Sequence, residues 1–218
     1  MNTLKVQKMS KFFSPEGKIY LFMARLYDVL KLNMLWLLCS LPVVTAGAAT
    51  IAAFSVTLRM AEDTEGGIAK SFWAAFKANL KQGIVMTFVT VFGVWAVYLN
   101  FEIHRATENI MFLIIAIISA YIVVFSLLYA YPLLARYENT VLNTLKNSFK
   151  ISMRYFLRSI FVVVIAAIGI AVICWSRTTL IIGLLIGPVT IFLAMSGPTM
   201  AIFRIIDAAN SEKDTSEN

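Results

Sequence analysis

The amino-acid sequence predicts an all-α fold, a polytopic membrane helix bundle. Of its 218 residues, 60% are apolar and only 14% are charged, which is roughly half the charged fraction of a soluble domain. The chain also contains five long runs without a charged residue, at 32–58, 82–101, 109–135, 159–176 and 178–203. A helix needs about 20 apolar residues to cross a bilayer. These observations exclude a water-soluble enzyme, a secreted disulfide scaffold and a disordered chain.

The distribution of positive charge predicts the orientation of the helices. If the first run crosses the membrane twice, or enters and returns, 17 of the 19 Lys and Arg residues lie on one side. A single crossing would divide them almost evenly. Because cytoplasmic loops collect Lys and Arg, we expect an even number of crossings with both termini cytoplasmic. The bundle then has six spans, or four spans plus one re-entrant hairpin.

The first two spans are predicted at residues 19–43 and 45–58. The charged residues of the first span lie in its cytoplasmic half, where long side chains can reach the interface. The chain reverses at LPVVTAG, since Pro42 disfavours continued helix and Gly47 permits a turn. Together with Thr45, these two residues are a candidate structural hinge. A complete crossing and a re-entrant turn are both compatible with this pattern.

Four further spans are predicted at residues 83–100, 110–134, 159–175 and 179–205. We expect a single membrane domain over residues 1–210. The tail, residues 211–218, has no apolar residue and is predicted to be disordered cytoplasmic sequence.

The last span contains backbone irregularities that form a second candidate hinge. Gly183 and Gly187 make a close-packing motif, and Gly187-Pro188 is followed by Gly197-Pro198 ten residues later. A proline inside a membrane helix frees a carbonyl group that needs another partner. The helix is therefore either broken along a path through the membrane or statically kinked against its neighbours. Three nearby hydroxyl residues are candidate partners for the freed carbonyls: Thr190, Ser196 and Thr199.

Two cytoplasmic segments, residues 68–81 and 141–154, are predicted to be basic amphipathic helices that each lead into a span. Their apolar stripes are Ala69, Phe72, Trp73, Phe76 and Leu80 in the first, and Leu142, Leu145, Phe149 and Met153 in the second. Each stripe lies beside a row of Lys or Arg. Such a helix rests in the lipid headgroup layer or docks a protein partner. The candidate lipid or partner contacts are Phe72, Phe76, Lys77, Phe149 and Lys150.

The sequence contains no pattern that indicates catalysis. His104 is the only histidine, and no CxxC or P-loop motif is present. Spans two to six contain no Asp, Glu, Lys, Arg or His apart from Arg204 at the cytoplasmic end of the last. Coupled carriers usually keep an ionisable residue at membrane depth. We therefore expect a protein that is not an enzyme and that has no catalytic residue, no metal, no cofactor, and no nucleotide or nucleic acid partner.

Two motifs carry a resemblance to a known family. They are NMLWLLCSLPVVTAG, with Asn33, Trp36, Leu41, Pro42, Thr45 and Gly47, and the later Phe72-x-x-x-Phe76-Lys77-x-Asn79 segment. In these motifs, in length and in segment order, the chain resembles the YesL family of bacterial multi-pass membrane proteins. The resemblance implies a bacterial cell membrane protein associated with carbohydrate ABC importers, and it supplies no catalytic residue.

Two functions follow as hypotheses. The first is an accessory subunit or regulator that works with a carbohydrate ABC importer and interacts with its membrane subunits. The second is a self-contained facilitator, channel or lipid-handling protein, which the two Gly-Pro breaks and the Pro42 turn would serve. In both, the lipid bilayer is the principal surrounding partner.

Overall fold

The computed structural model describes residues 18–64 and 66–216. Every regular element within them is a helix, which confirms the all-α prediction. In chain order the elements are α2 (Lys18–Ser40), the short 3-10 helix η1 (Val43–Thr45), α3 (Ala46–Met60), α4 (Ile68–Ala78), α5 (Leu80–Thr107), α6 (Ile110–Leu128), α7 (Ala130–Arg136), α8 (Val141–Arg154), α9 (Phe156–Ile173) and α10 (Arg177–Ser216).

Five segments of the described chain are long and apolar enough to cross a membrane: Val43–Met60, Leu80–Thr107, Ile110–Arg136, Phe156–Ile173 and Arg177–Ala209. The first predicted span is a helix, α2, but it does not qualify. Every part of α2 that is long enough to span includes Arg25, Asp28 and Lys31. The predicted count of six spans is therefore not confirmed, and the structure supports a membrane-type helical architecture with five candidate spans.

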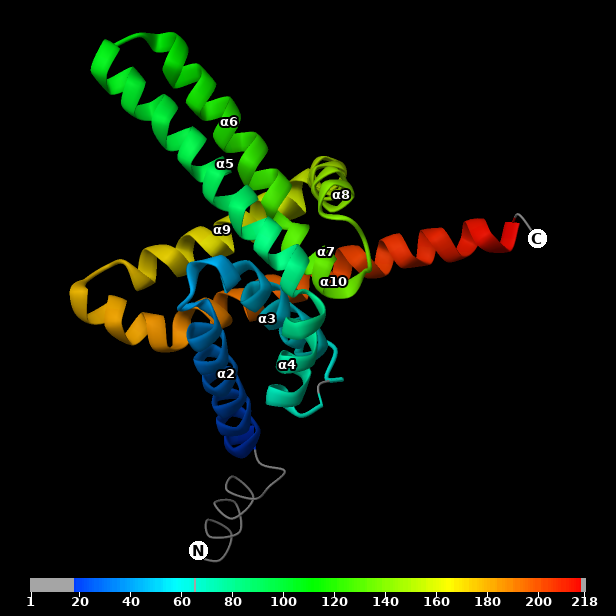
Figure 1. Cartoon of the computed structure of the whole chain (residues 1–218). Helices are drawn as coiled ribbons and strands as arrows, with labels where there is room; N and C mark the ends of the chain where they lie inside the picture. The colour runs from blue at the N-terminus through cyan, green and yellow to red at the C-terminus, as the bar shows by residue number, and fades with distance from the viewer. Residues whose placement is uncertain (1–17, 65, 217–218) are drawn as a thin grey trace, which may run out of the picture.

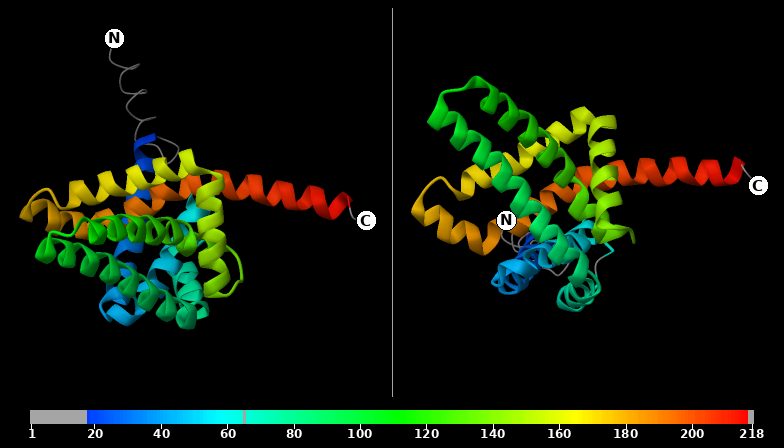
Figure 2. Two further views of the ribbon diagram at one scale, coloured as in Figure 1. Left: turned by 90° about the horizontal axis from the view of Figure 1, so that it is seen from above. Right: turned by 45° about the horizontal axis from the view of Figure 1, so that its top comes forward.

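The helices are arranged around α3, which lies near the centre (Figure 1). The α5–α6 hairpin and the α9–α10 hairpin project from this centre, and in the view from above both extend toward the same end of the molecule (Figure 2). The last turns of α10 extend in the opposite direction. The molecule thus has one end formed by the tips of two hairpins and an opposite end where α10 emerges.

The central position of α3 follows from its small side chains. In the Val43–Met60 segment, 67% of the residues are buried within the protein. In the most apolar stretches of Leu80–Thr107 and Ile110–Arg136, only 11% of the residues are buried. The fully buried residues of α3 include Ala48, Ala49, Ala52 and Ala53. Small residues let neighbouring helices approach closely. Accordingly α2, α4, α5, α7 and α10 all contact α3.

The fourth predicted span, residues 110–134, is divided at Tyr129 into α6 and α7. The Tyr129 N–H donates to the Ser148 hydroxyl at 3.1 Å instead of to the carbonyl of Phe125. That carbonyl accepts a hydrogen bond from the Ser152 hydroxyl at 2.8 Å. Side chains that insert into the helical ladder in this way break a helix. Pro132 is tolerated because it falls in the first turn of the new helix.

The two amphipathic helices form where they are predicted, with one difference at an end. The predicted helix 141–154 corresponds to α8 residue for residue, and its Thr140 side chain caps the N-terminus by accepting from the Asn143 N–H. The predicted helix 68–81 ends earlier, at Ala78, because the backbone of Asn79 leaves helical geometry before α5 begins.

The last helix, α10, continues to Ser216, so it includes residues 211–216 of the predicted tail. No glycine or proline occurs after Pro198 to stop the helix. Residues 217–218, like residues 1–17 of the predicted domain, lie outside the described residues.

Candidate functional site

The turn between α2 and α3, residues 41–45, is apolar and exposed, yet hydroxyl groups bond much of its backbone. Leu41 and Val43 are 76% and 67% exposed. The Thr45 hydroxyl lies 2.7 Å from the carbonyl oxygen of Cys39 and 2.9 Å from that of Pro42, which also accepts the Thr45 N–H. Irregular backbone at membrane depth requires such internal partners. The geometry of this turn is therefore suited to a position inside the bilayer.

A second hydroxyl, from α5, holds the start of α3. Thr87 accepts a hydrogen bond from the Gly47 N–H at 2.9 Å, and its own oxygen lies 3.1 Å from the Val44 carbonyl. At this crossing a Cβ on Gly47 would collide with the carbonyl oxygen of Gly83, and a Cβ on Gly83 would collide with Ala48. No glycine among the described residues has a positive φ. Gly47 is therefore required by close helix approach and not by an unusual backbone angle.

The helix α10 is continuous through Pro188, and the break that the proline leaves in its hydrogen-bond ladder is filled by a side chain from α2. Asn33 is completely buried. Its amide nitrogen donates to the Leu184 carbonyl at 2.9 Å, which is the carbonyl that Pro188 leaves without a helical donor. Its amide oxygen accepts from the Val189 N–H at 3.2 Å. The break is thus closed by a bidentate contact between two helices, and α2 is fastened to α10.

The three hydroxyl residues of α10 do not supply this partner. The Thr190 hydroxyl donates to the Ile186 carbonyl. The Ser196 hydroxyl lies 2.8 Å from the Phe192 carbonyl oxygen and 2.9 Å from the Thr57 hydroxyl. The Thr199 hydroxyl is buried and has no hydrogen-bond partner in the described chain. The expectation that they bond the proline-freed carbonyls is therefore wrong for Pro188.

The two Gly-Pro pairs of α10 have different surroundings. A Cβ on Gly187 would collide with the Ile173 side chain of α9, and Gly183 also packs on Ile173. At Gly197 a Cβ would meet nothing within 4 Å, and Pro198 is half-buried. Gly187 therefore serves helix packing, whereas Gly197 faces open space.

The predicted contacts of α4 divide between a buried and an outer face. Phe72 is fully buried, and the half-buried Phe76 stacks on it with ring centroids 6.1 Å apart. Trp73 is 43% exposed and meets Phe76 edge to face, and Lys77 is also exposed. Since Phe72 belongs to the core around α2 and α3, only Trp73, Phe76 and Lys77 remain for an outside contact.

The buried face of α8 is not its predicted apolar stripe. The buried residues are Thr144, Ser148 and Ser152, spaced four apart along the helix. Leu142 is exposed and Phe149 is half-buried, while Lys150 is exposed. The small hydroxyl face packs on α6 and α7 because its oxygens bond the break at Tyr129. The sequence signal for this face is the four-residue spacing of its small hydroxyl residues.

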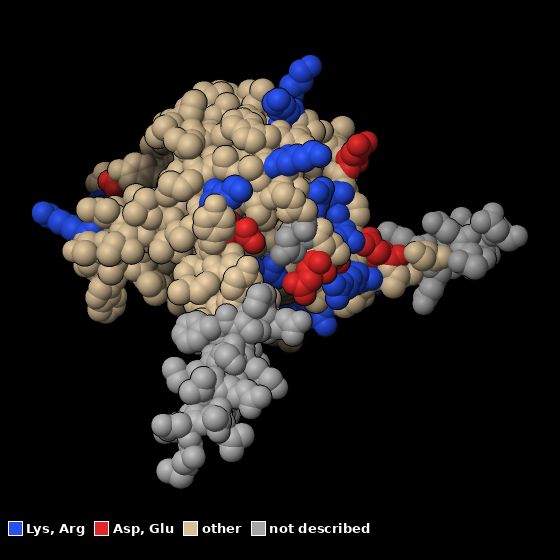
Figure 3. Space-filling model, turned by 90° about the horizontal axis from the view of Figure 1, so that it is seen from below, with Lys and Arg blue, Asp and Glu red and all other residues tan. Residues whose placement is uncertain are grey.

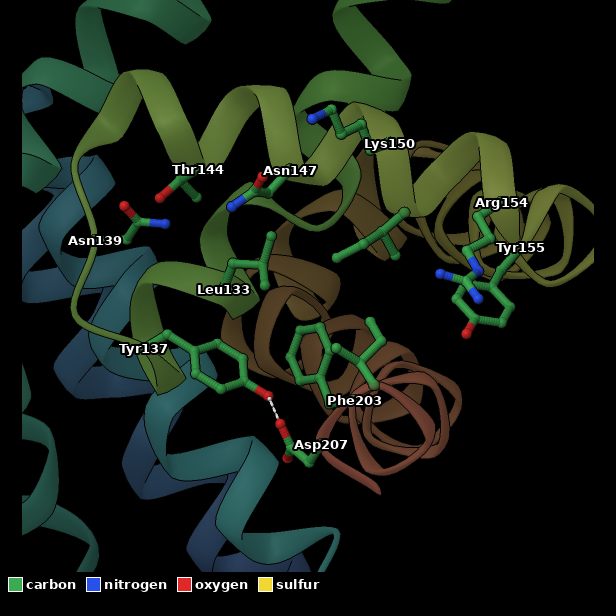
Figure 4. Close-up of a pocket in the computed structure, with 12 residues that line it drawn as sticks. Leu133, Tyr137, Asn139, Thr144, Asn147, Lys150, Arg154, Tyr155, Phe203 and Asp207 are labelled. Carbon is green, nitrogen blue, oxygen red and sulfur yellow. Dashed lines mark hydrogen bonds between the residues drawn. The ribbon is translucent and has the colours of Figure 1, made fainter. Parts of the chain in front are cut away.

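An ion-pair network joins the C-terminal ends of α3 and α7 to residues 204–207 within α10. Arg136 lies 3.0 Å from Asp207 and 3.8 Å from Glu62, and Glu62 also pairs with Arg204 at 3.3 Å. The Tyr137 hydroxyl donates to Asp207 at 2.7 Å (Figure 4). Burial and this hydrogen bond raise the pKa of Tyr137 to about 12, so the phenol stays protonated as a donor. The segments that follow α3 and α7 therefore lie at the same end of the molecule as Asp207.

Positive charge gathers at this end. Figure 3 shows Lys and Arg side chains concentrated on the side from which α10 emerges, with little charge toward the hairpin tips. At the other end, the α2–α3 turn has no charged residue, whereas the α5–α6 tip carries Glu102, Arg105 and Glu108. The described residues contain no group of three His, Cys, Asp or Glu that could hold a metal ion.

Comparison with known proteins gives one match. Residues 29–101 match the family model described as "Protein of unknown function, DUF624". The matched stretch begins in α2, includes α3 and α4, and ends within α5, so it contains Asn33, Thr45, Gly47 and Thr87. No curated protein and no solved structure matches the chain. The α2–α5 part of this protein is therefore similar to a domain of an uncharacterised family.

Proposed function

We propose that this chain is an integral membrane protein that acts as an accessory subunit or regulator and has no chemistry of its own. The resemblance of its two motifs to the YesL family indicates the membrane subunits of a bacterial carbohydrate ABC importer as its partner. Both termini are cytoplasmic in this proposal, which places the charged end of the molecule in the cytoplasm of a bacterial cell.

The observation that carries this proposal is the outer face of α4. Ile68 and Phe72 anchor the helix in the core, so its outer face is held rigidly. That face presents Trp73 between Lys70 and Lys77, all three exposed. Exposed aromatic side chains on a rigid helix are typical anchors of protein interfaces. The centre of the bundle is filled by α3, which favours a docking role over transport through the centre.

The same proposal includes a re-entrant α2–α3 hairpin and four complete spans. The segment that contains α3, Val43–Met60, has 18 residues, or about 27 Å of helix, which is at the short end for crossing the about 30 Å hydrocarbon core. Its uncharged apolar turn would be unfavourable in water, and Thr45 and Thr87 bond its backbone internally. These features support a turn that remains inside the membrane.

Co-purification tests the docking proposal. Trp73→Ala should reduce recovery of the importer's membrane subunits with the tagged protein in mild detergent, because the variant removes an exposed anchor and leaves the buried Phe72 beneath it in place. Trp95→Ala is the matched control, since Trp95 is 55% exposed but lies on α5. Equal recovery with both variants, or no importer subunit with the native chain, would contradict the proposal.

The alternative is a self-contained facilitator, channel or lipid-handling protein, favoured by the two Gly-Pro pairs of α10 and by the turn at Pro42. It predicts that the purified protein alone moves a solute across liposomes. It also predicts that a bulky residue at Gly197, where space is open, blocks that flux. Such flux would favour the facilitator over the accessory subunit.

A further inference from the structure

A cavity of about 340 Å³ lies between α7, α8 and α10, beside the ion-pair network (Figure 4). Its apolar wall includes Leu133, Ile151 and Phe203. Polar groups line the other parts, among them Asn139, Asn147 and Lys150. The volume is within the range of small-molecule sites, which combine apolar walls with a few polar groups.

The α8 side of the cavity is positively charged. Lys150 and Arg154 are one helical turn apart and both line it, and neither forms an ion pair with a described residue. The Arg154 guanidinium lies 5.9 Å from the centre of the Tyr155 ring, and Arg158 lies 6.0 Å from the same centre. Two guanidinium groups therefore flank the Tyr155 ring, and one of them, Arg154, lines the cavity together with Lys150, which favours an anion.

Among the described residues that line the cavity, the one carboxylate does not cancel this charge. Asp207 is paired with Arg136 at 3.0 Å and accepts the Tyr137 hydroxyl at 2.7 Å. It is therefore compensated from the α7 side and leaves Lys150 and Arg154 unneutralised. An anion that enters the cavity would meet the positive charges of Lys150 and Arg154 on α8. On α10 it would meet the Asp207 carboxylate, which is already paired with Arg136.

Uncharged groups in the cavity indicate what the anion is attached to. The Asn147 side chain forms no hydrogen bond with a described residue, and Asn139 uses its amide oxygen for the Thr140 N–H, which leaves its two amide hydrogens. Amide groups of this kind donate to and accept from hydroxyl groups. The aromatic rings of Tyr155 and Phe203 supply apolar surface beside them.

We propose that this cavity binds a phosphate ester of a small polyol, with the phosphate at Lys150 and Arg154 and the hydroxyl groups at Asn139 and Asn147. This chemistry occurs in the headgroup of phosphatidylglycerol and in free polyol or sugar phosphates. The site does not depend on the importer partner proposed above, because all of its groups belong to this chain.

Isothermal titration of the full-length protein in neutral detergent tests the site in two arms. One arm uses short-chain phosphatidylglycerol, with short-chain phosphatidylcholine for comparison, and the other uses glycerol 3-phosphate. Arg154→Gln and Lys150→Gln should each weaken binding about tenfold, the loss of one charge-assisted contact. Lys146→Gln is the matched control, because Lys146 is exposed on the same helix but does not line the cavity.

A further variant tests the recognition of the polyol. Asn147→Leu should weaken the binding of phosphatidylglycerol or glycerol 3-phosphate. It should leave the binding of inorganic phosphate unchanged. Binding in the lipid arm alone assigns the site to a headgroup, and binding in the soluble arm assigns it to a free ester. No binding in either arm, or an equal effect of Arg154→Gln and Lys146→Gln, would overturn the proposal.

Discussion

At the scale of single residues, polar side chains from one helix complete the broken backbone of another. Asn33 bonds both sides of the break at Pro188, and Thr87 bonds the turn before α3. Both residues lie in the stretch similar to DUF624. Within a bilayer no water replaces such a partner, so these contacts carry more weight than exposed ones.

Replacing Asn33 by leucine should lower stability by about 1 to 3 kcal/mol, because the Leu184 carbonyl and the Val189 N–H lose their partner in a buried site. The measurement is thermal unfolding in detergent. Asn100→Leu is the control, since the Asn100 side chain bonds only Ala96 on its own helix and is not buried. An Asn33→Leu protein as stable as the control would show that the contact contributes nothing.

Gly47→Val should destabilise the protein by about 1 to 3 kcal/mol or more, since the added atoms collide with the backbone of Gly83. Expression and the melting temperature in detergent should both fall. The control is Gly197→Ala, where the new Cβ meets open space. An unchanged melting temperature for Gly47→Val would show that α3 and α5 can move apart without a loss of stability.

At the scale of elements, α4 and α8 show what an amphipathic pattern does and does not predict. Their helical state and the bounds of α8 follow from the pattern. For α4 the apolar stripe supplies the buried Phe72, but α8 buries Thr144, Ser148 and Ser152. The reason is that α8 packs on a broken helix, whose free backbone groups attract hydroxyl side chains more than apolar ones.

The double variant Ser148→Ala, Ser152→Ala should therefore lower the melting temperature, because the Tyr129 N–H and the Phe125 carbonyl lose their hydroxyl partners. A loss of about 1 to 3 kcal/mol is expected for buried backbone groups left unpaired. Leu142→Ala, at an exposed position on the same helix, should be nearly silent. A larger fall in melting temperature for Leu142→Ala than for the double variant would show that the apolar stripe is the packing face.

At the scale of the whole molecule, the ion-pair network unites segments that are far apart in the chain. Glu62 follows α3, Arg136 ends α7 and Asp207 lies within the last part of α10, and the three meet at one end of the molecule. This agrees with a topology in which the basic segments share one side. The tips of α5–α6 and α9–α10 lie toward the other end (Figure 2).

A native cysteine offers a test of this topology. Cys174 is exposed at the α9–α10 tip, whereas Cys39 is buried. In intact cells, an impermeant thiol reagent should label the native protein, and Cys174→Ser should abolish the labelling. Labelling only after the membrane is permeabilised would place the tip inside and reverse the proposed orientation. A cysteine introduced at Val43 in a chain lacking both native cysteines should resist the reagent if the α2–α3 hairpin is re-entrant.

The sequence by itself determined the all-α class, the places of the apolar helices and the two interfacial helices, because these depend on local composition and periodicity. It also singled out the reversal at Pro42 and the irregular last helix from their prolines and glycines. Only the tertiary structure decided that Asn33 closes the break at Pro188, that α3 is the centre, and that α8 buries its hydroxyl face. Those features depend on which side chain meets which freed backbone group, and helices distant in the chain supply both partners.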